Sequence, residues 1–208
     1  MNLDLLRERV SAAPTPTGDA LADWHAELAS ASVALVTASD TTWDSASSAV
    51  SNEVDAGVGA LMLIDDTAPD AHSRAIAALY CGQDATSVIP DTLSDFDWML
   101  LCAEVRDAMP ELRQRVSDPV ALLDASPMLR WHVSAILHAA ARRTPVLLAG
   151  AVPVIAGLCA QRAVPLSSGW IHIGLASTDP AARAAESRLG RPVWFTTSLH
   201  FSADTTQR

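Results

Sequence analysis

Acidic residues follow two short apolar runs of the chain, at positions where side chains could do chemistry. Asp65 and Asp66 come directly after Ala60–Ile64, and Asp40 closes the segment that begins with Val33–Thr37. A carboxylate can act as a general acid or base, or can ligate magnesium. Because ligands bind at the carboxyl ends of strands in a parallel sheet, all three acids are candidate ligand-binding residues.

Two further apolar runs end in residues that a ligand could approach. Gly150 closes Pro145–Ala149, and the loop after Trp170–Gly174 contains Ser177 and Asp179. These residues also follow the carboxyl ends of predicted strands, where ligands bind in a parallel sheet. The candidate ligand-binding residues are therefore Asp40, Asp65, Asp66, Gly150, Ser177 and Asp179. No residue is assigned a catalytic role from its position alone.

The apolar runs alternate with stretches of helical periodicity. We predict strands at 33–37, 60–64, 145–149, 170–174 and 193–197, and helices at roughly 18–30, 44–56, 70–81, 94–116, 128–143, 151–162 and 180–189. Near-continuous apolar strands separated by helices predict an α/β fold with three layers, a mainly parallel, Rossmann-like sheet with helices on both faces. We expect residues 1–56 to be an N-terminal helical segment and first strand of the same domain, 57–200 the main α/β domain, and 201–208 a tail.

The composition excludes several classes of function. The chain has 208 residues, of which 50% are hydrophobic, and it contains no lysine, which excludes a Walker A loop and a lysine Schiff base. A net charge of −10 argues against nucleic acid as a partner. The apolar runs are far shorter than the roughly 20 residues of a membrane span, and the N-terminus lacks the pattern of a secretory signal. We therefore expect a cytoplasmic protein that binds no membrane.

The cysteines and histidines give no sign of a metal or cofactor site. Cys81, Cys102 and Cys159 are widely spaced within apolar stretches, without the spacing of a zinc site. His132 and His138 lie six residues apart, which does not place them on one helix face as paired ligands. We expect no bound metal and no cofactor, and we interpret the histidines as structural or surface residues.

Several segments between residues 57 and 199 carry a more specific pattern. They are Asp118-Pro-Val-Ala-Leu-Leu, then Ala135-Ile-Leu-His-Ala-Ala-Ala-Arg-Arg-Thr-Pro-Val-Leu-Leu-Ala-Gly, then Ser177-Thr-Asp-Pro-Ala-Ala-Arg, with the unit from Gly57 to Gly82 before them. In this order and spacing they resemble the nicotinate-nucleotide:dimethylbenzimidazole phosphoribosyltransferases. Residues 1–56 match that family less closely, and a long internal piece of the family is missing near Val54.

The resemblance implies a glycosyltransferase of cobalamin biosynthesis. Such an enzyme moves the phosphoribosyl group of nicotinate mononucleotide onto dimethylbenzimidazole, which gives α-ribazole phosphate and nicotinate. It needs a base for the azole proton, glycine-rich loops that hold the phosphate, and a hydrophobic slot for the aromatic base. Since the family works as dimers, the resemblance also implies a homodimer.

The chain departs from the family at the residues that do this chemistry. Where the family has a glutamate in Gly-Glu-Gly-Thr-Gly, this sequence reads Leu199-His-Phe-Ser-Ala-Asp-Thr. Where the family has a glycine-rich phosphate loop, it reads Ile64-Asp-Asp-Thr-Ala-Pro-Asp-Ala-His-Ser, whose carboxylates repel a phosphate. The Gly-Gly before the long helix is replaced by Ala125-Ser126, and the strand-end Asp-Gly by Ala149-Gly150. We expect weak or lost transferase activity, as in a pseudoenzyme, with a pocket for a nucleotide or an aromatic base.

Two alternatives remain open. The chain could be a non-catalytic partner or regulator of a cobalamin-pathway enzyme. It could instead act on a related nucleotide through Asp65 and Asp66, because in another class of phosphoribosyltransferases two acids after a strand contact ribose hydroxyls. A simpler interpretation is a solvated strand end with Asp70 capping the next helix. Ser177 and Asp179 have a comparable interpretation, in which they cap and pack a helix start.

Overall fold

The computed structural model describes residues 33–38 and 42–195 of the chain. Their five strands form one sheet in which every neighbouring pair is parallel, in the order β1-β2-β3-β4-β5. The strands are β1 (Val33–Val36), β2 (Ala60–Ile64), β3 (Val146–Ala149), β4 (Ile171–Leu175) and β5 (Val193–Phe195). The predicted α/β class and parallel sheet are confirmed.

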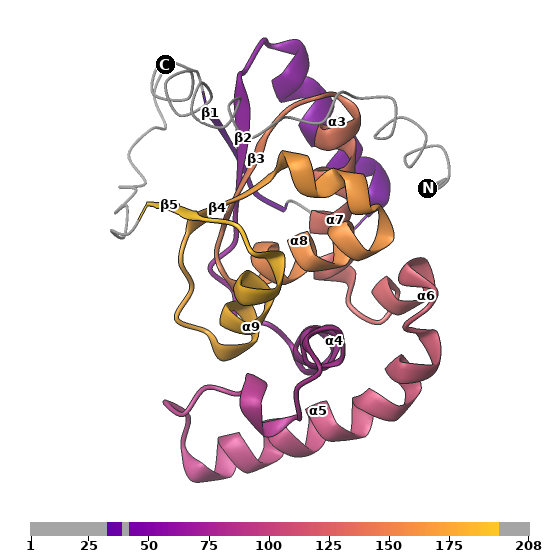
Figure 1. The fold of residues 1–208 in the computed structure, drawn as a ribbon, viewed down its shortest axis with the longest axis vertical. Helices are drawn as coiled ribbons and strands as arrows, with labels where there is room; N and C mark the ends of the chain where they lie inside the picture. Colours follow the sequence, from indigo (N-terminus) through magenta and orange to yellow (C-terminus); the bar gives the residue numbers. More distant parts are fainter. Residues whose placement is uncertain (1–32, 39–41, 196–208) are drawn as a thin grey trace.

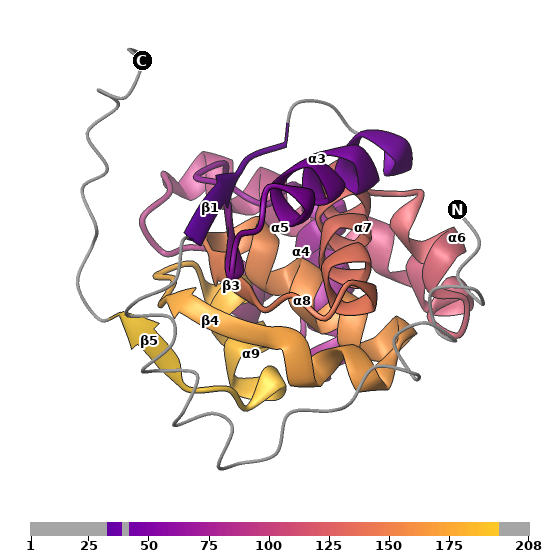
Figure 2. The same ribbon diagram turned by 90° about the horizontal axis from the view of Figure 1, so that it is seen from above.

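Helices form two further layers beside the sheet. The first layer contains α3 (Trp43–Asp55), α7 (Pro127–Ala141), α8 (Ala151–Ala163) and α9 (Pro180–Leu189), each packed against the next in the order of the strands. Next to α8 and α9 lies α4 (Ala71–Cys81), and α5 (Asp95–Arg115) packs against α4 on its outer side (Figures 1 and 2). The short helices are α6 (Pro119–Leu123) and the 3₁₀ helices η1 (Thr86–Val88) and η2 (Pro165–Trp170).

The order of the strands explains why these helices lie together. Each strand pairs with the strand that follows it in sequence, and a β-α-β crossover is right-handed almost without exception. Successive crossovers therefore place their helices on the same face of the sheet. In the part of the chain that the structure describes, the helices lie on one side of the sheet in both views, and not on both faces as predicted, because the sequential strand order gives every crossover the same side (Figures 1 and 2).

Both faces of the sheet are buried, as the near-continuous apolar strands predict. Leu61, Leu63 and Leu148 belong to the large core beneath the helices. Met62 and Leu147 point to the opposite face and belong to a second, smaller apolar cluster, with exposed fractions of 4% and 2%. Alternate residues of one strand thus serve two cores, which is why the strands show no polar alternation.

Local sequence sets the helix boundaries near the strand ends. Asp70 caps α4, where its carboxylate accepts a hydrogen bond from the Ser73 amide, as the capping interpretation predicts. Asp179 caps α9 in the same way, and Pro180 occupies the first turn. The left-handed Gly190 ends α9.

Most other predicted elements agree with the structure to within one or two residues at each end. Helix α6 is a separate short helix that periodicity did not predict, capped by Asp118. The two 3₁₀ helices were also missed, because three to six residues are too few to show a helical period. The predicted helix at 18–30 lies outside the described residues.

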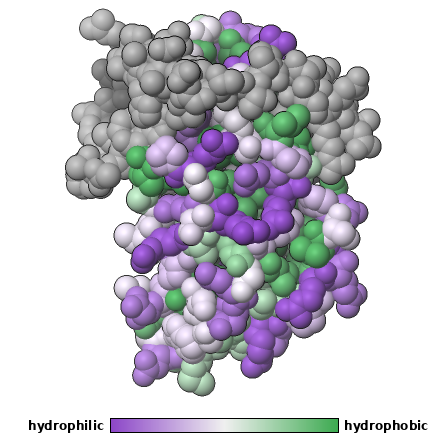
Figure 3. Space-filling view, viewed as in Figure 1, coloured by the Kyte–Doolittle hydropathy of each residue, from purple (hydrophilic) through white to green (hydrophobic). Residues whose placement is uncertain are grey.

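The surface has a mixed character. In the view of Figure 3, apolar residues lie in small groups among polar and charged ones over the described part of the face shown. No described helix is both long and apolar enough to cross a membrane.

Candidate functional site

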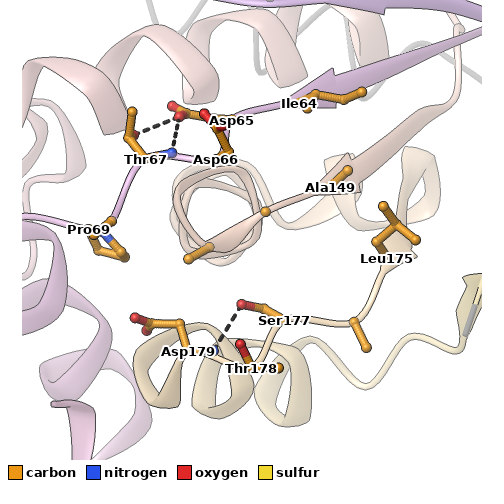
Figure 4. A pocket seen from close by; sticks show the side chains of 14 residues that line it. Ile64, Asp65, Asp66, Thr67, Pro69, Ala149, Leu175, Ser177, Thr178 and Asp179 are labelled. Carbon is orange, nitrogen blue, oxygen red and sulfur yellow. Dashed lines mark hydrogen bonds between the residues drawn. The ribbon is translucent and has the colours of Figure 1, made fainter. Parts of the chain in front are cut away.

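The carboxyl ends of β2, β3 and β4 surround a pocket of about 450 Å³. Five of the sequence-derived candidates line it, namely Asp65, Asp66, Gly150, Ser177 and Asp179. Figure 4 shows Asp65 and Thr67 on one wall and Ser177, Thr178 and Asp179 on the opposite wall. The parallel sheet brings these loops together because all its strands end at the same edge. The sixth candidate, Asp40, lies outside the described residues.

Gly150 is the point of closest approach between two of these loops. Its φ is +109°, and a Cβ atom built on it would lie 1.9 Å from the backbone oxygen of Asp65. The Asp65 amide also donates a hydrogen bond to the Ala149 carbonyl, which extends the pairing of β2 with β3. No residue with a side chain fits at position 150 without moving the β2 loop.

Asp65 stabilises the turn that forms the first wall. Its Oδ1 atom accepts hydrogen bonds from the Thr67 amide at 2.9 Å and from the Thr67 hydroxyl at 2.6 Å. The side chain of Asp65 is only 7% exposed, whereas Asp66 and Thr67 are exposed. An aspartate that binds the backbone two residues later is a common turn device. Thr67 thus joins the pocket surface to a buried carboxylate.

The second oxygen of Asp65 faces a histidine from α7. The Oδ2 atom lies 3.7 Å from Nε2 of His132, whose side chain is fully buried. Neither atom has a hydrogen-bond partner among the residues that the structure describes. The other ring nitrogen of His132, Nδ1, lies 3.0 Å from the Met128 carbonyl oxygen. Burial lowers the pKa of the His132 imidazole, while the Met128 carbonyl and the Asp65 carboxylate oppose that effect.

The two candidates on the opposite wall already have structural partners. Asp179 receives two hydrogen bonds from the guanidinium of Arg74, at 3.2 and 2.8 Å, and caps α9. The Ser177 amide donates to Glu186, and the Ser177 hydroxyl accepts from the Asp179 amide. Burial raises the pKa of Glu186, while the Ser177 hydrogen bond and the charge of Arg183 oppose it. These contacts fit the interpretation in which Ser177 and Asp179 cap and pack the helix start.

The charged side chains in the described lining of the pocket are acidic. They are Asp65, Asp66 and Asp179, and none of the described lining residues is an arginine, lysine or histidine. Arg74 lies behind Asp179 and is ion-paired with it. The partly positive N-terminus of α8 begins at Gly150 beside the pocket. Among the described residues, no group of three or more histidine, cysteine, aspartate or glutamate residues could hold a metal ion.

Comparison with known proteins identifies the family of this chain. A family model described as "Phosphoribosyltransferase" (DBI_PRT) matches residues 20–202. The chain belongs to this family. A nicotinate-nucleotide–dimethylbenzimidazole phosphoribosyltransferase of Streptomyces avermitilis is 34% identical over 143 residues, which make up 66% of this chain and 38% of that relative. One of Corynebacterium glutamicum strain R is 39% identical over 95 residues, 45% of this chain and 26% of that relative.

Solved structures show the same fold. A crystal structure of CobT from Thermus thermophilus matches with a TM-score of 0.62 at 16% identity, over 74% of this chain and 47% of that one. A second structure, of the nicotinate-nucleotide–dimethylbenzimidazole phosphoribosyltransferase from the same organism, gives 0.59 at 16% identity, over 73% and 46%. The chain therefore spans less than half the length of these members of the phosphoribosyltransferase family.

Three residues at or near the pocket were not predicted from the sequence to belong to the site. His132 was interpreted as a structural histidine, and Arg74 was not singled out. Thr67 was included only as part of the loop that follows Ile64. The signal that could have found His132 is its position between Leu129, Val133 and Ile136 on an apolar helix, which places a titratable ring in the core. The stretch Leu199–Thr205, where the family has its glutamate, lies outside the described residues.

Proposed function

We propose that the chain binds a neutral aromatic base, of the dimethylbenzimidazole type, in the pocket at the ends of β2, β3 and β4. The observation that carries this proposal is the lining of the pocket. Ile64, Ala149 and Leu175 supply apolar contact, while Thr67 and Asp66 offer a hydroxyl and a carboxylate to an azole N–H. A volume of about 450 Å³ is within the range of small-molecule sites.

The charge of the pocket favours the base over the nucleotide. A phosphate that enters it meets the exposed carboxylate of Asp66, and none of the described lining side chains is basic. The charge of Asp179 is already paired with Arg74. The positive end of α8 offsets only part of this repulsion, because its effect is equivalent to about half a charge. We therefore propose that the chain belongs to the cobalamin pathway as a divergent transferase with weak or absent activity of its own.

Binding of a related nucleotide through Asp65 and Asp66 has less support. Asp65 directs Oδ1 to Thr67 and Oδ2 to His132, so its carboxylate is turned away from the pocket (Figure 4). Asp66 alone then remains at this strand end as an exposed carboxylate. A single carboxylate is a poor magnesium site without the phosphates of a bound nucleotide.

An exposed apolar surface on α5 favours a second proposal, which is self-association of the chain. Phe96, Met99 and Leu100 on α5 are 74%, 65% and 52% exposed. Large apolar side chains grouped on one helix face commonly mark a protein contact. We propose that this face joins two copies of the chain in the homodimer that the family resemblance implies. The cytoplasmic location is likewise a proposal that rests on the sequence alone.

Two measurements on the purified chain test the proposed function. Dimethylbenzimidazole should raise the melting temperature, since a ligand that binds the native state stabilises it, and nicotinate mononucleotide should raise it less. With both substrates present, α-ribazole phosphate should form slowly or not at all. Turnover of about one per second or faster would contradict the loss of activity. An unchanged melting temperature with saturating dimethylbenzimidazole would contradict the base pocket.

A further inference from the structure

Thr67, Asp65 and His132 form a row of polar groups from the pocket surface into the protein core. The Thr67 hydroxyl lies 2.6 Å from Oδ1 of Asp65, and Oδ2 of the same carboxylate faces Nε2 of His132 at 3.7 Å. Thr67 is exposed, the Asp65 side chain is 7% exposed and the His132 side chain is 0% exposed. These three side chains therefore lead from the solvent to the fully buried core.

No proton lies between Nε2 of His132 and Oδ2 of Asp65, at the buried end of this row of polar groups. A carbonyl oxygen only accepts hydrogen bonds, so Nδ1 of His132, 3.0 Å from the Met128 oxygen, carries the ring hydrogen. In the neutral imidazole Nε2 then presents a lone pair to Oδ2 of Asp65. Both atoms are buried and without a hydrogen-bond partner, and 3.7 Å is too long for a hydrogen bond. Two buried acceptors that face each other cost free energy, and one proton between them removes that cost.

We propose that Thr67, Asp65 and His132 are a proton relay that takes the N–H proton of an azole bound in the pocket. This inference rests on the proposed function, because the azole is its proton donor. Thr67 is the residue that touches the ligand, whereas Asp65 and His132 act through it. The relay supplies the base for the azole proton from described residues. The family resemblance assigns that role to a glutamate that the stretch Leu199–Thr205 of this sequence lacks.

The proton balance of the step is simple. In the weak transfer proposed above, the free azole nitrogen forms a bond to C1′ of nicotinate mononucleotide while the azole N–H proton passes to the Thr67 oxygen. The hydroxyl proton of Thr67 passes to Oδ1 of Asp65 at the same time. The electron pair of the broken glycosidic bond stays on the nitrogen of the leaving nicotinate. A half turn of the protonated Asp65 carboxyl then brings its proton to Nε2 of His132.

A ligand-free experiment tests the relay itself. Imidazole ¹⁵N shifts, measured over a pH titration of histidine-labelled protein, report the tautomer and the protonation of His132. We expect Nδ1 to carry hydrogen throughout and Nε2 to take up the proton. In Asp65→Asn the uptake should move to lower pH, because the amide donates to Nε2 and carries no charge. In Thr67→Val it should move to higher pH, because the carboxylate loses a hydrogen bond and its charge shifts toward Oδ2.

The control is Thr67→Ser, which keeps the hydroxyl and should leave the titration of His132 unchanged. If Thr67→Val also leaves it unchanged, Thr67 does not communicate with His132 and the relay is wrong. This outcome does not depend on any ligand. Failure of the relay is therefore distinguishable from failure of the proposed function.

A second experiment adds the ligand. Dimethylbenzimidazole, whose N–H donates to the Thr67 oxygen, should strengthen the Thr67–Asp65 hydrogen bond and move the proton uptake of His132 to lower pH, whereas its N-methylated form, which has no N–H to donate, should bind without that change. In Asp65→Asn neither ligand should change the pH of this uptake. Equal responses to the two ligands, or none despite binding, would overturn the relay. If dimethylbenzimidazole does not bind, the proposal of a pocket for the base is wrong. The ligand-free titration then still tests whether Thr67 and His132 are coupled.

Discussion

Arg74 and Asp179 form a buried, bidentate ion pair that joins the two walls of the pocket from behind. The Arg74 side chain is 2% exposed and the Asp179 side chain 14%. The guanidinium also donates to the carbonyls of Pro69 and Val88. Pro69 belongs to the β2 loop and Asp179 to the β4 loop, so a single arginine sets the separation of the two loops.

Removal of Asp179 should destabilise the protein strongly. Asp179→Ala leaves the Arg74 charge buried without its partner, which costs about 3–5 kcal/mol, and it also removes the cap of α9. Urea denaturation measures the loss. The matched control is Asp55→Ala, which breaks the exposed pair with Arg142 and should cost less than about 1 kcal/mol. Equal losses in the two variants would show that the Arg74 pair is not buried as described.

Gly150→Ala adds only one methyl group, but it should destabilise the protein and distort the pocket. The new methyl group would overlap the Asp65 carbonyl, and the backbone at φ +109° disfavours any side chain. We expect a lower free energy of unfolding and a loss of stabilisation by dimethylbenzimidazole. Gly190→Ala is the control, since it also has positive φ but open space around it, and it should cost only about 1 kcal/mol. A Gly150→Ala variant as stable as the control contradicts the close approach.

Stability should fall as the pH drops below about 6.5, the ordinary pKa of an unfolded histidine. Burial lowers the folded-state pKa of His132, so the unfolded chain takes up this proton first and is favoured by acid. One such group contributes a slope of at most about 1.4 kcal/mol per pH unit. His132→Gln should reduce the slope measured by denaturation between about pH 5 and 8, and exposed His72→Gln should not. Identical slopes in all three proteins would rule out this role of His132.

Asp66 should weaken the binding of anions to the pocket. Asp66→Asn removes an exposed negative charge from the lining, so nicotinate mononucleotide should bind about two- to fivefold more tightly at low salt. The gain should shrink at high salt, because screening already weakens the repulsion. Calorimetric titration measures both. Asp44→Asn on α3, which is also exposed and does not line this pocket, should have no effect.

The exposed face of α5 should control self-association. Phe96→Ser combined with Leu100→Ser removes the apolar contact of the proposed homodimer, so the mass measured by sedimentation should fall from dimer to monomer. The control, Leu93→Ser, changes a less exposed apolar residue before the helix and should leave the mass unchanged. A dimer that survives the double substitution places the contact elsewhere.

Short-range patterns in the sequence predicted most of the fold. Apolar runs such as Ala60–Ile64 predict strands buried on both faces, and capping residues such as Asp70 and Asp179 fix helix starts through side chains two or three residues from the amides they bind. The grouping of Asp65, Gly150 and Ser177 around one pocket was also predictable, because the strands of a parallel sheet end at a common edge.

The sequence by itself determined the α/β class, the strand ends and the absence of glycine from the loop that follows Ile64. These depend on residue types and on neighbours within a few positions. Only the tertiary structure decided the partners of the buried polar groups. It places Arg74 on Asp179, 105 residues later in the chain, and His132 opposite Asp65. No local pattern specifies such pairs, since they form only when strand order and helix packing bring distant segments together.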